Sequence, residues 1–448
     1  MTLAERIGWL AGELRARAIA HEVPGATIAV IASDELVEAA TGVINRRTGV
    51  TTTTDAVFQI GSITKLMTAT LIMQLIEQGR FTLDTRVQTL LPGFQLGDAV
   101  AAASITVRQL LCHSSGMDGD FFEDTGRGDD GIERYLLAMR ALPQLHAPGA
   151  GFSYCNAGFV VLGRIVEVSL GVSWHVAMRD RLFKPLGMRS FGTTAEQTLR
   201  HRAAIGHVRE PGDSAWHITR TPFLALSNAP AGATPFGTAA DLLRFARCML
   251  GRGELDGQRV LQTQTVEQMW QPQNPLPHRL MADSFGLAFM RWQWGDALVV
   301  GHDGGTSGQF AFMRLVPAAG VAIALLTNGG DARALYRDLF GRLLSELATV
   351  QLPVPTEPST APVDLLPYIG RYERLSTRVD VSIEAGQLIG QHTQKRFPAA
   401  PVLRTRFLPA GGPVFLAETE GAVGRSEVAF LSAPDALHMG GRLHPKVA

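Results

Sequence analysis

Ser62 and Lys65 are the residues of this chain whose types and spacing first suggest chemistry. They stand three positions apart at the start of a stretch with helical spacing, so they share one helix face. A serine hydroxyl becomes a good nucleophile when a base takes its proton, and burial or nearby positive charge lowers the pKa of a lysine enough for that role. The pair predicts acyl transfer through a serine. The alternative, a helix-capping serine beside a solvated lysine, is weakened by the apolar neighbours.

Two further segments carry groups that suit the same chemistry. Tyr154-Cys155-Asn156 precedes an expected helix; a phenol can relay a proton, and an amide can orient a lysine and a substrate carbonyl. His302-Asp303-Gly304-Gly305 follows an expected strand. Its histidine can donate or accept a hydrogen bond near neutral pH, and its glycines let the backbone approach a ligand. Alone, the first segment is more often a loop tyrosine with a helix N-cap asparagine, and the second is equally compatible with a strand-end turn and a surface histidine.

In the order Ser-x-x-Lys, Tyr-x-Asn, His-x-Gly, these motifs resemble the serine β-lactamase and penicillin-binding-protein superfamily. The similarity is to its class C-like branch, with D-aminopeptidases, esterases and penicillin-binding-protein-type thioesterases. It covers roughly residues 5–347. Further matching segments are Leu-Leu-Cys-His-Ser-Ser-Gly-Met at 110–117, Pro148-Gly149, and Lys-Pro-Leu-Gly-Met at 184–188.

The resemblance implies a role for each residue of the motifs. It makes Ser62 the acylated nucleophile, Lys65 its activator and Tyr154 a general acid/base, and it leaves open whether Lys65 or Tyr154 is the base. Asn156 would position Lys65 and the substrate amide. The resemblance further assigns the oxyanion hole to the backbone N–H groups of Ser62 and Gly305, and substrate binding to Gly304.

His302 departs from the β-lactamase pattern, which has a lysine at this place to hold a substrate carboxylate. His-x-Gly is more similar to the D-aminopeptidase and esterase relatives, in which the histidine supports the tyrosine and the tetrahedral intermediate. We therefore expect peptides, amides or esters, including substrates with a D-residue, rather than efficient β-lactam hydrolysis.

The helices and strands that we expect around these residues indicate an α+β fold. We expect one N-terminal helix over 1–21, a hairpin of strands 26–31 and 36–43, and a largely buried helix over 62–78. An α-rich insertion follows at about 83–230. Beyond a helix over 242–250, the expected antiparallel strands are 285–290, 297–300, 310–316 and 321–327, followed by a helix over 332–347. This pattern suits the β-lactamase/transpeptidase-like fold of the resemblance, an antiparallel sheet flanked by helices.

The prolines between 352 and 362 predict a semi-rigid linker, so we divide the chain into a catalytic domain (1–348), a linker (349–364) and a C-terminal domain (365–448). Seven short strand-like runs follow the linker, which indicates a small antiparallel β-barrel. With Tyr-Ile-Gly-Arg-Tyr at 368–372, this region is similar to the lipocalin-like barrels of related peptidases and thioesterases. In that group an arginine from the last strand reaches the active-site mouth, and Arg442 is the matching candidate for substrate binding.

The composition of the chain limits the classes of partner that it is expected to bind. The 41 basic and 41 acidic residues leave no net charge to attract nucleic acid or an anionic membrane surface. Three cysteines without ligand spacing predict no disulfide framework and no metal site, and the N-terminal stretch lacks a signal-peptide core. We expect a cytoplasmic protein without a cofactor that binds a small peptide, ester or acyl-thioester substrate, including a carrier-protein-linked acyl chain. Gly-x-Ser-x-Gly and zinc-binding helices are not found, which disfavours an α/β-hydrolase or a metallohydrolase.

Three functions remain open at this point. The first is a serine hydrolase that passes the acyl group from Ser62 to water. The second is a penicillin-binding-protein-type thioesterase or transacylase that passes it to an amine, such as a nonribosomal peptide cyclase. The third is a catalytically silent ligand-binding module, against which the complete motif set argues.

Overall fold

The computed structural model describes residues 1–209, 213, 215–395, 400–422, 424–432 and 435–447. Its centre is an antiparallel sheet of strand order β10-β11-β12-β13-β14-β15-β1-β2-β3. The strands of this sheet are β1 (Gly25–Ala32), β2 (Glu35–Asn45), β3 (Val50–Thr51), β10 (Asn274–Pro275), β11 (Ser284–Phe285), β12 (Met290–Trp294), β13 (Ala297–Gly305), β14 (Phe310–Val316) and β15 (Val321–Thr327).

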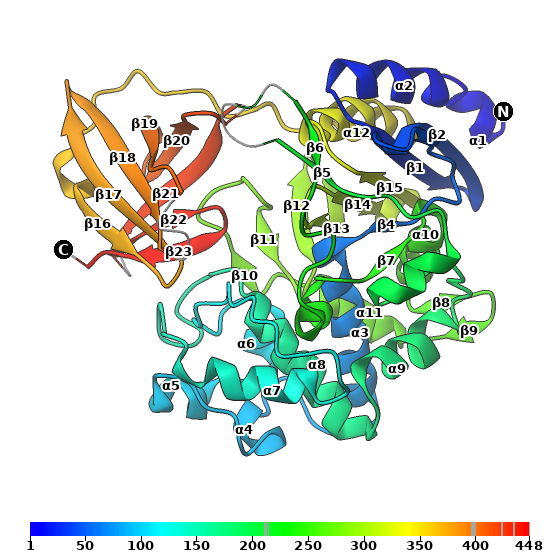
Figure 1. The fold of residues 1–448 in the computed structure, drawn as a ribbon, viewed down its shortest axis with the longest axis horizontal. Helices are drawn as coiled ribbons and strands as arrows, with labels where there is room; N and C mark the ends of the chain where they lie inside the picture. The colour runs from blue at the N-terminus through cyan, green and yellow to red at the C-terminus, as the bar shows by residue number, and fades with distance from the viewer. Residues whose placement is uncertain (210–212, 214, 396–399, 423, 433–434, 448) are drawn as a thin grey trace.

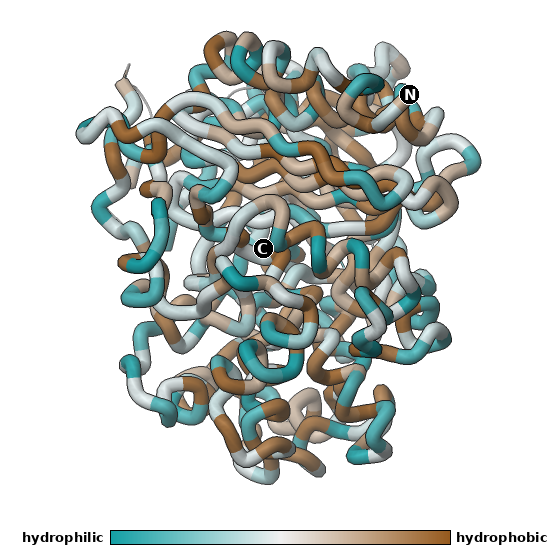
Figure 2. Tube along the Cα trace, turned by 90° about the vertical axis from the view of Figure 1, so that its right-hand side faces the viewer, coloured by the Kyte–Doolittle hydropathy of each residue, from teal (hydrophilic) through white to brown (hydrophobic). Residues whose placement is uncertain are grey.

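Both faces of the sheet centre are buried, which explains the continuous apolar runs of β1 and β15. Successive side chains of a strand point to opposite faces. In β1, Ile28 and Val30 pack into the core beneath α2 (Leu10–Ala20) and α12 (Ala332–Ala348), whereas Ala29 and Ile31 pack into the core of the helical layer. Figure 1 shows α2 and α12 above the sheet and the helical layer below it, and Figure 2 shows the hydrophobic stretches of chain crossing between them.

The helical layer contains the central helix α3 (Thr64–Glu77), which is buried on all sides from Thr64 to Leu75. A helix that is apolar all round belongs inside a protein, and α3 packs there against α8 (Asn156–Leu170). The other helices are α1 (Leu3–Arg6), α4 (Val87–Leu90), α5 (Ala99–Ser104), α6 (Val107–Leu111), α7 (Gly131–Ala138), α9 (Trp174–Met178), α10 (Ala239–Leu250) and α11 (Thr263–Trp270). Three strand pairs join this part: β4 (Phe58–Gln59) with β7 (Phe236–Gly237), β5 (His207–Val208) with β6 (His217–Ile218), and β8 (Glu254–Leu255) with β9 (Gln258–Arg259).

The C-terminal region is a nearly closed barrel in which the strands pair in sequence order. Its strands are β16 (Gly370–Glu373), β17 (Thr377–Glu384), β18 (Gln387–Gln394), β19 (Leu403–Gly411), β20 (Val414–Thr419), β21 (Ser426–Ser432), β22 (Asp435–Met439) and β23 (Arg442–Pro445). A bridge between Tyr372 and Lys446 brings its ends together. The expected α+β fold with a C-terminal antiparallel barrel is confirmed, and the barrel lies beside the helical layer and the β10–β12 end of the sheet (Figure 1).

Several elements differ from the expectation, among them the strand expected over 297–300, which continues to Gly305 as β13. The N-terminal helix is two helices, because α1 ends at Arg6 and α2 begins at Leu10. The strand expected over 285–290 is the end of β11, a turn, and the start of β12; Ala288 in that turn has a φ of +66°. The strand β23 was not expected, since its four residues include His444 and Pro445 and have no alternating pattern.

Among the described residues, no single helix has both the length and the apolar composition of a membrane span. Only α8 and the segment Trp174–Phe183 meet that test, and only when they are taken together across a bend of 82°.

Candidate active site

Ser62 lies in a single 3-10 turn, η1 (Gly61–Ile63), between β4 and α3. Gly61 has a φ of +52°, which a glycine adopts without steric cost. Gly232 packs against this turn so closely that a Cβ there would lie 2.2 Å from the Gly61 carbonyl oxygen. The position before α3 is Ile63, so Ser62 does not cap the helix. The turn instead holds the hydroxyl at the edge of a cavity.

Lys65 is fully buried and its amine has three close neighbours. The Nζ atom lies 2.8 Å from Asn156 Oδ1, 2.5 Å from the Ala231 carbonyl oxygen and 2.9 Å from Ser62 Oγ. The amide and carbonyl oxygens can only accept, so they take two N–H bonds. A neutral amine has two N–H groups and one lone pair, and its lone pair then faces the Ser62 hydroxyl. The geometry suits an amine that receives the serine proton.

Electrostatics support the neutral form of this amine. Burial, and next the nearby Arg442 guanidinium, hold the pKa of Lys65 well below its ordinary value, while Asp120 and Cys155 act in the opposite direction. Burial raises the pKa of the Tyr154 phenol, and its hydrogen bond with Ser62 only partly offsets that effect. Burial thus favours the uncharged form of both side chains, which suits the lysine as a base and the tyrosine as an acid.

Tyr154 precedes α8 and is held by groups on both of its sides. His113 stacks on its ring with centroids 4.2 Å apart, and Arg442 lies 4.8 Å from the ring centroid. His113 also accepts a hydrogen bond from the Cys155 N–H at Nδ1. Burial holds the pKa of His113 well below its ordinary value, so this stacked ring is neutral.

Asn156 is the first residue of α8, and Cys155 rather than Asn156 caps the helix. The Asn156 side chain bridges two groups: its Oδ1 accepts from Lys65, and its Nδ2 donates to Asp120 over 2.9 Å. The contact with Lys65 agrees with the expected positioning role. Asp120 takes one of the two N–H groups of this amide nitrogen.

His302 lies in β13, opposite Met313 of β14, and is fully buried. Its Nδ1 lies 2.5 Å from the Asp303 carbonyl oxygen, which can only accept, so the ring proton is on Nδ1. Burial lowers the pKa of His302 to about 3. The side chain is thus a neutral acceptor at Nε2 and carries no charge to hold a carboxylate.

The two expected oxyanion-hole residues come together through glycine packing. A Cβ on Gly61 would lie 2.4 Å from the Gly305 nitrogen, and a Cβ on Gly304 would lie 1.9 Å from the Ile60 carbonyl oxygen. The end of β13 and the η1 turn are therefore in backbone contact. This contact places the backbone nitrogen of Gly305 beside the turn that contains Ser62.

A cavity of about 510 Å³ opens over these residues between the two parts of the chain. Its walls include Ser62, Tyr154, His302, Gly304, Gly305, Phe310, Arg333, Ala417, Thr419, Arg425 and Arg442. The barrel supplies residues from β20 to β23, so it forms one wall of the candidate site.

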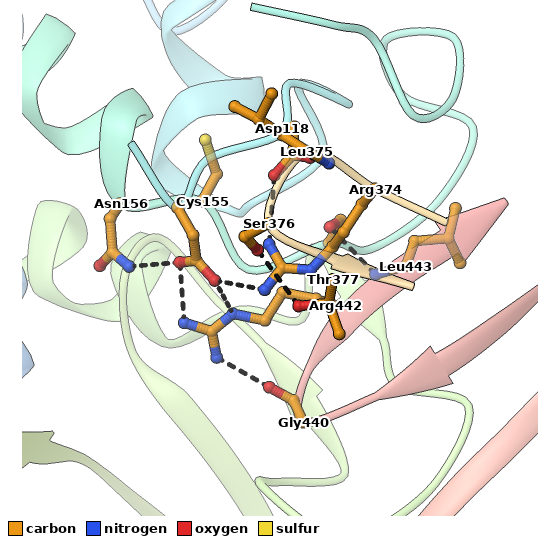
Figure 3. Close-up of polar contacts among 12 residues, drawn as sticks. Asp118, Cys155, Asn156, Arg374, Leu375, Ser376, Thr377, Gly440, Arg442 and Leu443 are labelled. Atoms are coloured by element: carbon orange, nitrogen blue, oxygen red, sulfur yellow. Dashed lines mark hydrogen bonds and ion pairs between the residues drawn. The ribbon is translucent and has the colours of Figure 1, made fainter. Parts of the chain in front are cut away.

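Arg442, the candidate from the barrel, lies in this cavity at the start of β23. Its Nε and Nη2 donate to Asp120 over 3.1 and 3.2 Å, and its Nη1 donates to the Gly440 carbonyl oxygen (Figure 3). Backbone bonds fix the strand beside the site, because Tyr154 N–H donates to Gly441 and Leu443 N–H donates to Ser153 Oγ.

No role was predicted for His113, Asp118, Asp120 or Arg374, which the structure places around Tyr154 and Asn156. His113 lies in one of the matching segments, and the Asp-x-Asp pair at 118 and 120 was a signal that went unused. Within the described part of the chain, no three His, Cys, Asp or Glu side chains gather as metal ligands.

Comparisons with known proteins agree with this geometry. The sequence model of the β-lactamase family matches residues 10–345. Penicillin-binding protein 4 of Amycolatopsis lactamdurans is 45% identical over 365 residues, covering 79% of this chain and 94% of that protein. Esterase EstB of Burkholderia gladioli is 28% identical over 190 residues, covering 39% of this chain and 48% of that protein.

Solved structures extend the similarity to the barrel. The crystal structure of SurE superposes with a TM-score of 0.80 at 28% identity and covers 99% of both chains. D-amino acid amidase of Ochrobactrum anthropi SV3 has a TM-score of 0.65 at 23% identity, covering 77% of this chain and 99% of that one, and so shares the fold. For the present chain, the family match, the relatives and the surroundings of Ser62 agree. The chain belongs to the β-lactamase family and is a serine hydrolase of the penicillin-binding-protein type.

Proposed function

We propose that the enzyme hydrolyses an amide, peptide or ester whose acyl part carries a D-residue, through an acyl-enzyme on Ser62. The observation that carries this proposal is the buried Lys65 amine, 2.9 Å from Ser62 Oγ with its two donor positions occupied. Such an amine has one free function, to accept the serine proton.

The reaction follows from the positions of the groups. Ser62 Oγ attacks the carbonyl carbon while its proton passes to Lys65 Nζ, and the oxyanion is bound by the N–H groups of Ser62 and Gly305. As the tetrahedral intermediate collapses, Tyr154 donates its proton to the leaving amine or alkoxide and regains one from Lys65. Water then attacks the ester on Ser62 by the reverse sequence of proton transfers.

The D-residue is supported by the relative that matches over the whole chain, since SurE is described in complex with D-Leu. Its identity of 28% and coverage of 99% include the barrel that walls the cavity. The ester substrates are supported by Esterase EstB. His302 favours amide and ester substrates over β-lactams. Its imidazole is neutral, so it cannot bind a substrate carboxylate as the lysine at this place in β-lactamases does.

The test is intact-mass analysis after incubation with a fluorophosphonate and, separately, with p-nitrophenyl esters of D-leucine and L-leucine. We expect one adduct on Ser62 in the wild type, none in Ser62→Ala, and faster turnover of the D-ester. An unmodified wild-type protein with every acyl donor would instead support a silent ligand-binding module. Equal turnover of the two leucine esters would remove the D-residue from the proposal.

Acyl transfer to an amine is a second candidate, and Arg442 is the observation that favours it. This guanidinium faces the cavity next to Tyr154, where it suits the carboxylate of an incoming peptide or amino acid. Two acceptors, water and an amine, are distinguished by measuring the products formed from an acyl thioester with and without added D-alanine. Formation of the amide product in wild type, and its selective loss in Arg442→Gln, would establish transfer; release of free acid alone would establish hydrolysis.

A further inference from the structure

Arg374 is a barrel residue that reaches into the catalytic domain. It lies between β16 and β17, and its two terminal nitrogens donate to Asp118 over 3.1 Å and to Asp120 over 2.8 Å. The neighbouring Leu375 N–H donates to the second oxygen of Asp118 over 2.6 Å. Figure 3 shows Arg374 and Arg442 approaching from different segments of the barrel, with Asn156 on the opposite side.

The contacts continue from this cluster to the nucleophile. Asp120 accepts from Asn156 Nδ2, and Asn156 Oδ1 accepts from Lys65, which lies beside Ser62. A carboxylate can only accept, so it selects the orientation of the Asn156 amide in which the nitrogen faces Asp120. That orientation is the one that turns the amide oxygen to Lys65.

The two carboxylates of this cluster, Asp118 and Asp120, are balanced by two arginines, Arg374 and Arg442, only when the barrel is in place. Asp118 is 1% exposed and the side chain of Asp120 is 13% exposed. Within the described part of the chain, their ion pairs are made with Arg374 and Arg442. Both of their partners, Arg374 and Arg442, belong to the barrel. Buried carboxylates without a partner are costly, so each loss of an arginine forces Asp120 to seek another donor.

We propose that Arg374 and Asp120 are positioning residues of the active site: Arg374 holds Asp120 in place, and Asp120 orients the Asn156 amide that holds Lys65. The proposal rests on the proposed acylation of Ser62. It makes the barrel a working part of the catalytic centre as well as a wall of the cavity. Neither residue lines the cavity, so neither is expected to touch the substrate.

Charge gives this role a direction that can be measured. Lys65 is surrounded by the charged groups Arg442 and Asp120, with Cys155, Tyr154, His113 and His302 as the other titratable groups that face it. Loss of the Arg374 cation leaves more of the Asp120 charge unbalanced and so favours protonated Lys65. Loss of the Asp120 charge disfavours it. The two variants should move the acidic limb of activity in opposite directions.

The experiment measures steady-state hydrolysis of p-nitrophenyl butyrate and the rate of fluorophosphonate labelling from pH 5 to 10. For Arg374→Gln we expect kcat to fall by about tenfold to a hundredfold with little change in KM, because misplacing a catalytic group by about 1 Å has an effect of that order. Its acidic limb should move to higher pH, and that of Asp120→Asn to lower pH. A residue that only supports folding would lower activity without opposed shifts.

Two further variants sharpen the result. Asp118→Asn/Arg374→Gln removes one charge of each sign, and we expect its acidic limb to return toward that of wild type. Arg371→Gln is the matched control, since Arg371 is an exposed β16 arginine paired with Asp380, and it should behave as wild type. Thermal unfolding of each variant checks that it is folded.

A second measurement does not depend on turnover. The chain has only four lysines, so the NMR signals of lysine labelled with 13C at Cε resolve the titration of Lys65 directly. We expect the Lys65 titration to move upward in Arg374→Gln and downward in Asp120→Asn. Unchanged titration and unchanged kcat in both folded variants would overturn the proposal. A wild-type protein that is never acylated, yet shows these shifts, would overturn the proposed function and leave the contact chain intact.

Discussion

At the scale of single residues, the site divides acid from base by burial. Removal from water disfavours the charged form of any group, so it lowers the pKa of the Lys65 amine and raises the pKa of the Tyr154 phenol. The same effect on two residues of opposite type produces an acceptor and a donor on either side of Ser62 Oγ. The sequence motifs left the base undecided, and the burial of both groups favours Lys65.

We therefore expect Tyr154→Phe to lose the proton donor and keep the ring contacts with His113. Its acylation by p-nitrophenyl butyrate should fall by about a hundredfold to ten thousandfold, the usual contribution of a general acid or base. Stopped-flow measurement of the nitrophenol burst gives this rate. The control is Tyr372→Phe, whose hydroxyl donates to the Tyr368 carbonyl within the barrel and should not affect acylation. A Tyr154→Phe enzyme with the wild-type rate would show that the phenol transfers no proton.

At the scale of elements, the proposed oxyanion hole depends on the contact between the end of β13 and the η1 turn. Gly304 and Gly61 allow this contact because a side chain at either position would meet the backbone of the other segment. The hole is therefore a property of two elements that are far apart in sequence. Separating them by a few tenths of an ångström changes the spacing of the N–H groups.

Gly304→Ala tests this packing. Its Cβ would overlap the Ile60 carbonyl oxygen, so we expect β13 to move away from Ser62 and acylation to fall by about a hundredfold to a thousandfold, as when one oxyanion donor is lost. The measurement is the fluorophosphonate labelling rate. Gly341→Ala in α12 is the matched control, because a Cβ there meets no atom within 4 Å. Wild-type labelling by Gly304→Ala would show that the close approach of β13 is not needed.

The sequence predicted some elements more closely than others, for physical reasons. The strands β14 and β15 were predicted to the residue, because each is an apolar run with clear ends. The turn between β11 and β12 was missed, since Ala288 adopts a positive φ that its residue type does not announce. Elsewhere, short strands such as β23 depend on pairing partners rather than on their own pattern.

The candidate site shows the same division. Ser62, Lys65, Tyr154 and Asn156 stand in local motifs, so residue type and spacing were enough to select them. The ion pair of Arg374 with Asp120 joins residues 254 positions apart, and no local pattern connects them. Contacts between the barrel and the catalytic domain therefore required the structure.

At the scale of the whole molecule, buried histidines make the contact between the two parts sensitive to acid. His438 of β22 lies 2.8 Å from His278 of the catalytic domain, and His444 of β23 is buried nearby. Burial lowers the pKa of His278 to about 4 and that of His444 to about 3, and it holds the pKa of His438 well below its ordinary value. All three are neutral when the barrel is docked.

Linkage then gives the sign of the pH dependence. Below the ordinary histidine pKa of about 6.5, the unfolded chain binds protons that the folded chain excludes, so stability falls as the pH decreases toward the lowered values. Each buried histidine costs about 2 kcal/mol at pH 5 on this basis, from roughly 1.5 pKa units at 1.36 kcal/mol each. Other buried histidines, among them His113 and His302 of the catalytic domain, add to this cost, and the pair of His278 and His438 places part of it at the barrel contact.

We expect calorimetry to show a clear fall in Tm between pH 7.5 and pH 5, and a smaller fall in His278→Asn. Asparagine keeps a polar partner for His438 but cannot titrate. The unfolded variant therefore binds one proton fewer at low pH, and its stability depends less on pH. The control is His217→Asn, an exposed histidine beside Asp213, which should not flatten the dependence. A His278→Asn protein whose Tm falls as steeply as that of wild type would show that the acid sensitivity arises elsewhere. The expected result would show that His278 contributes to the acid sensitivity of the barrel contact, through which Arg374 and Arg442 reach Asp120.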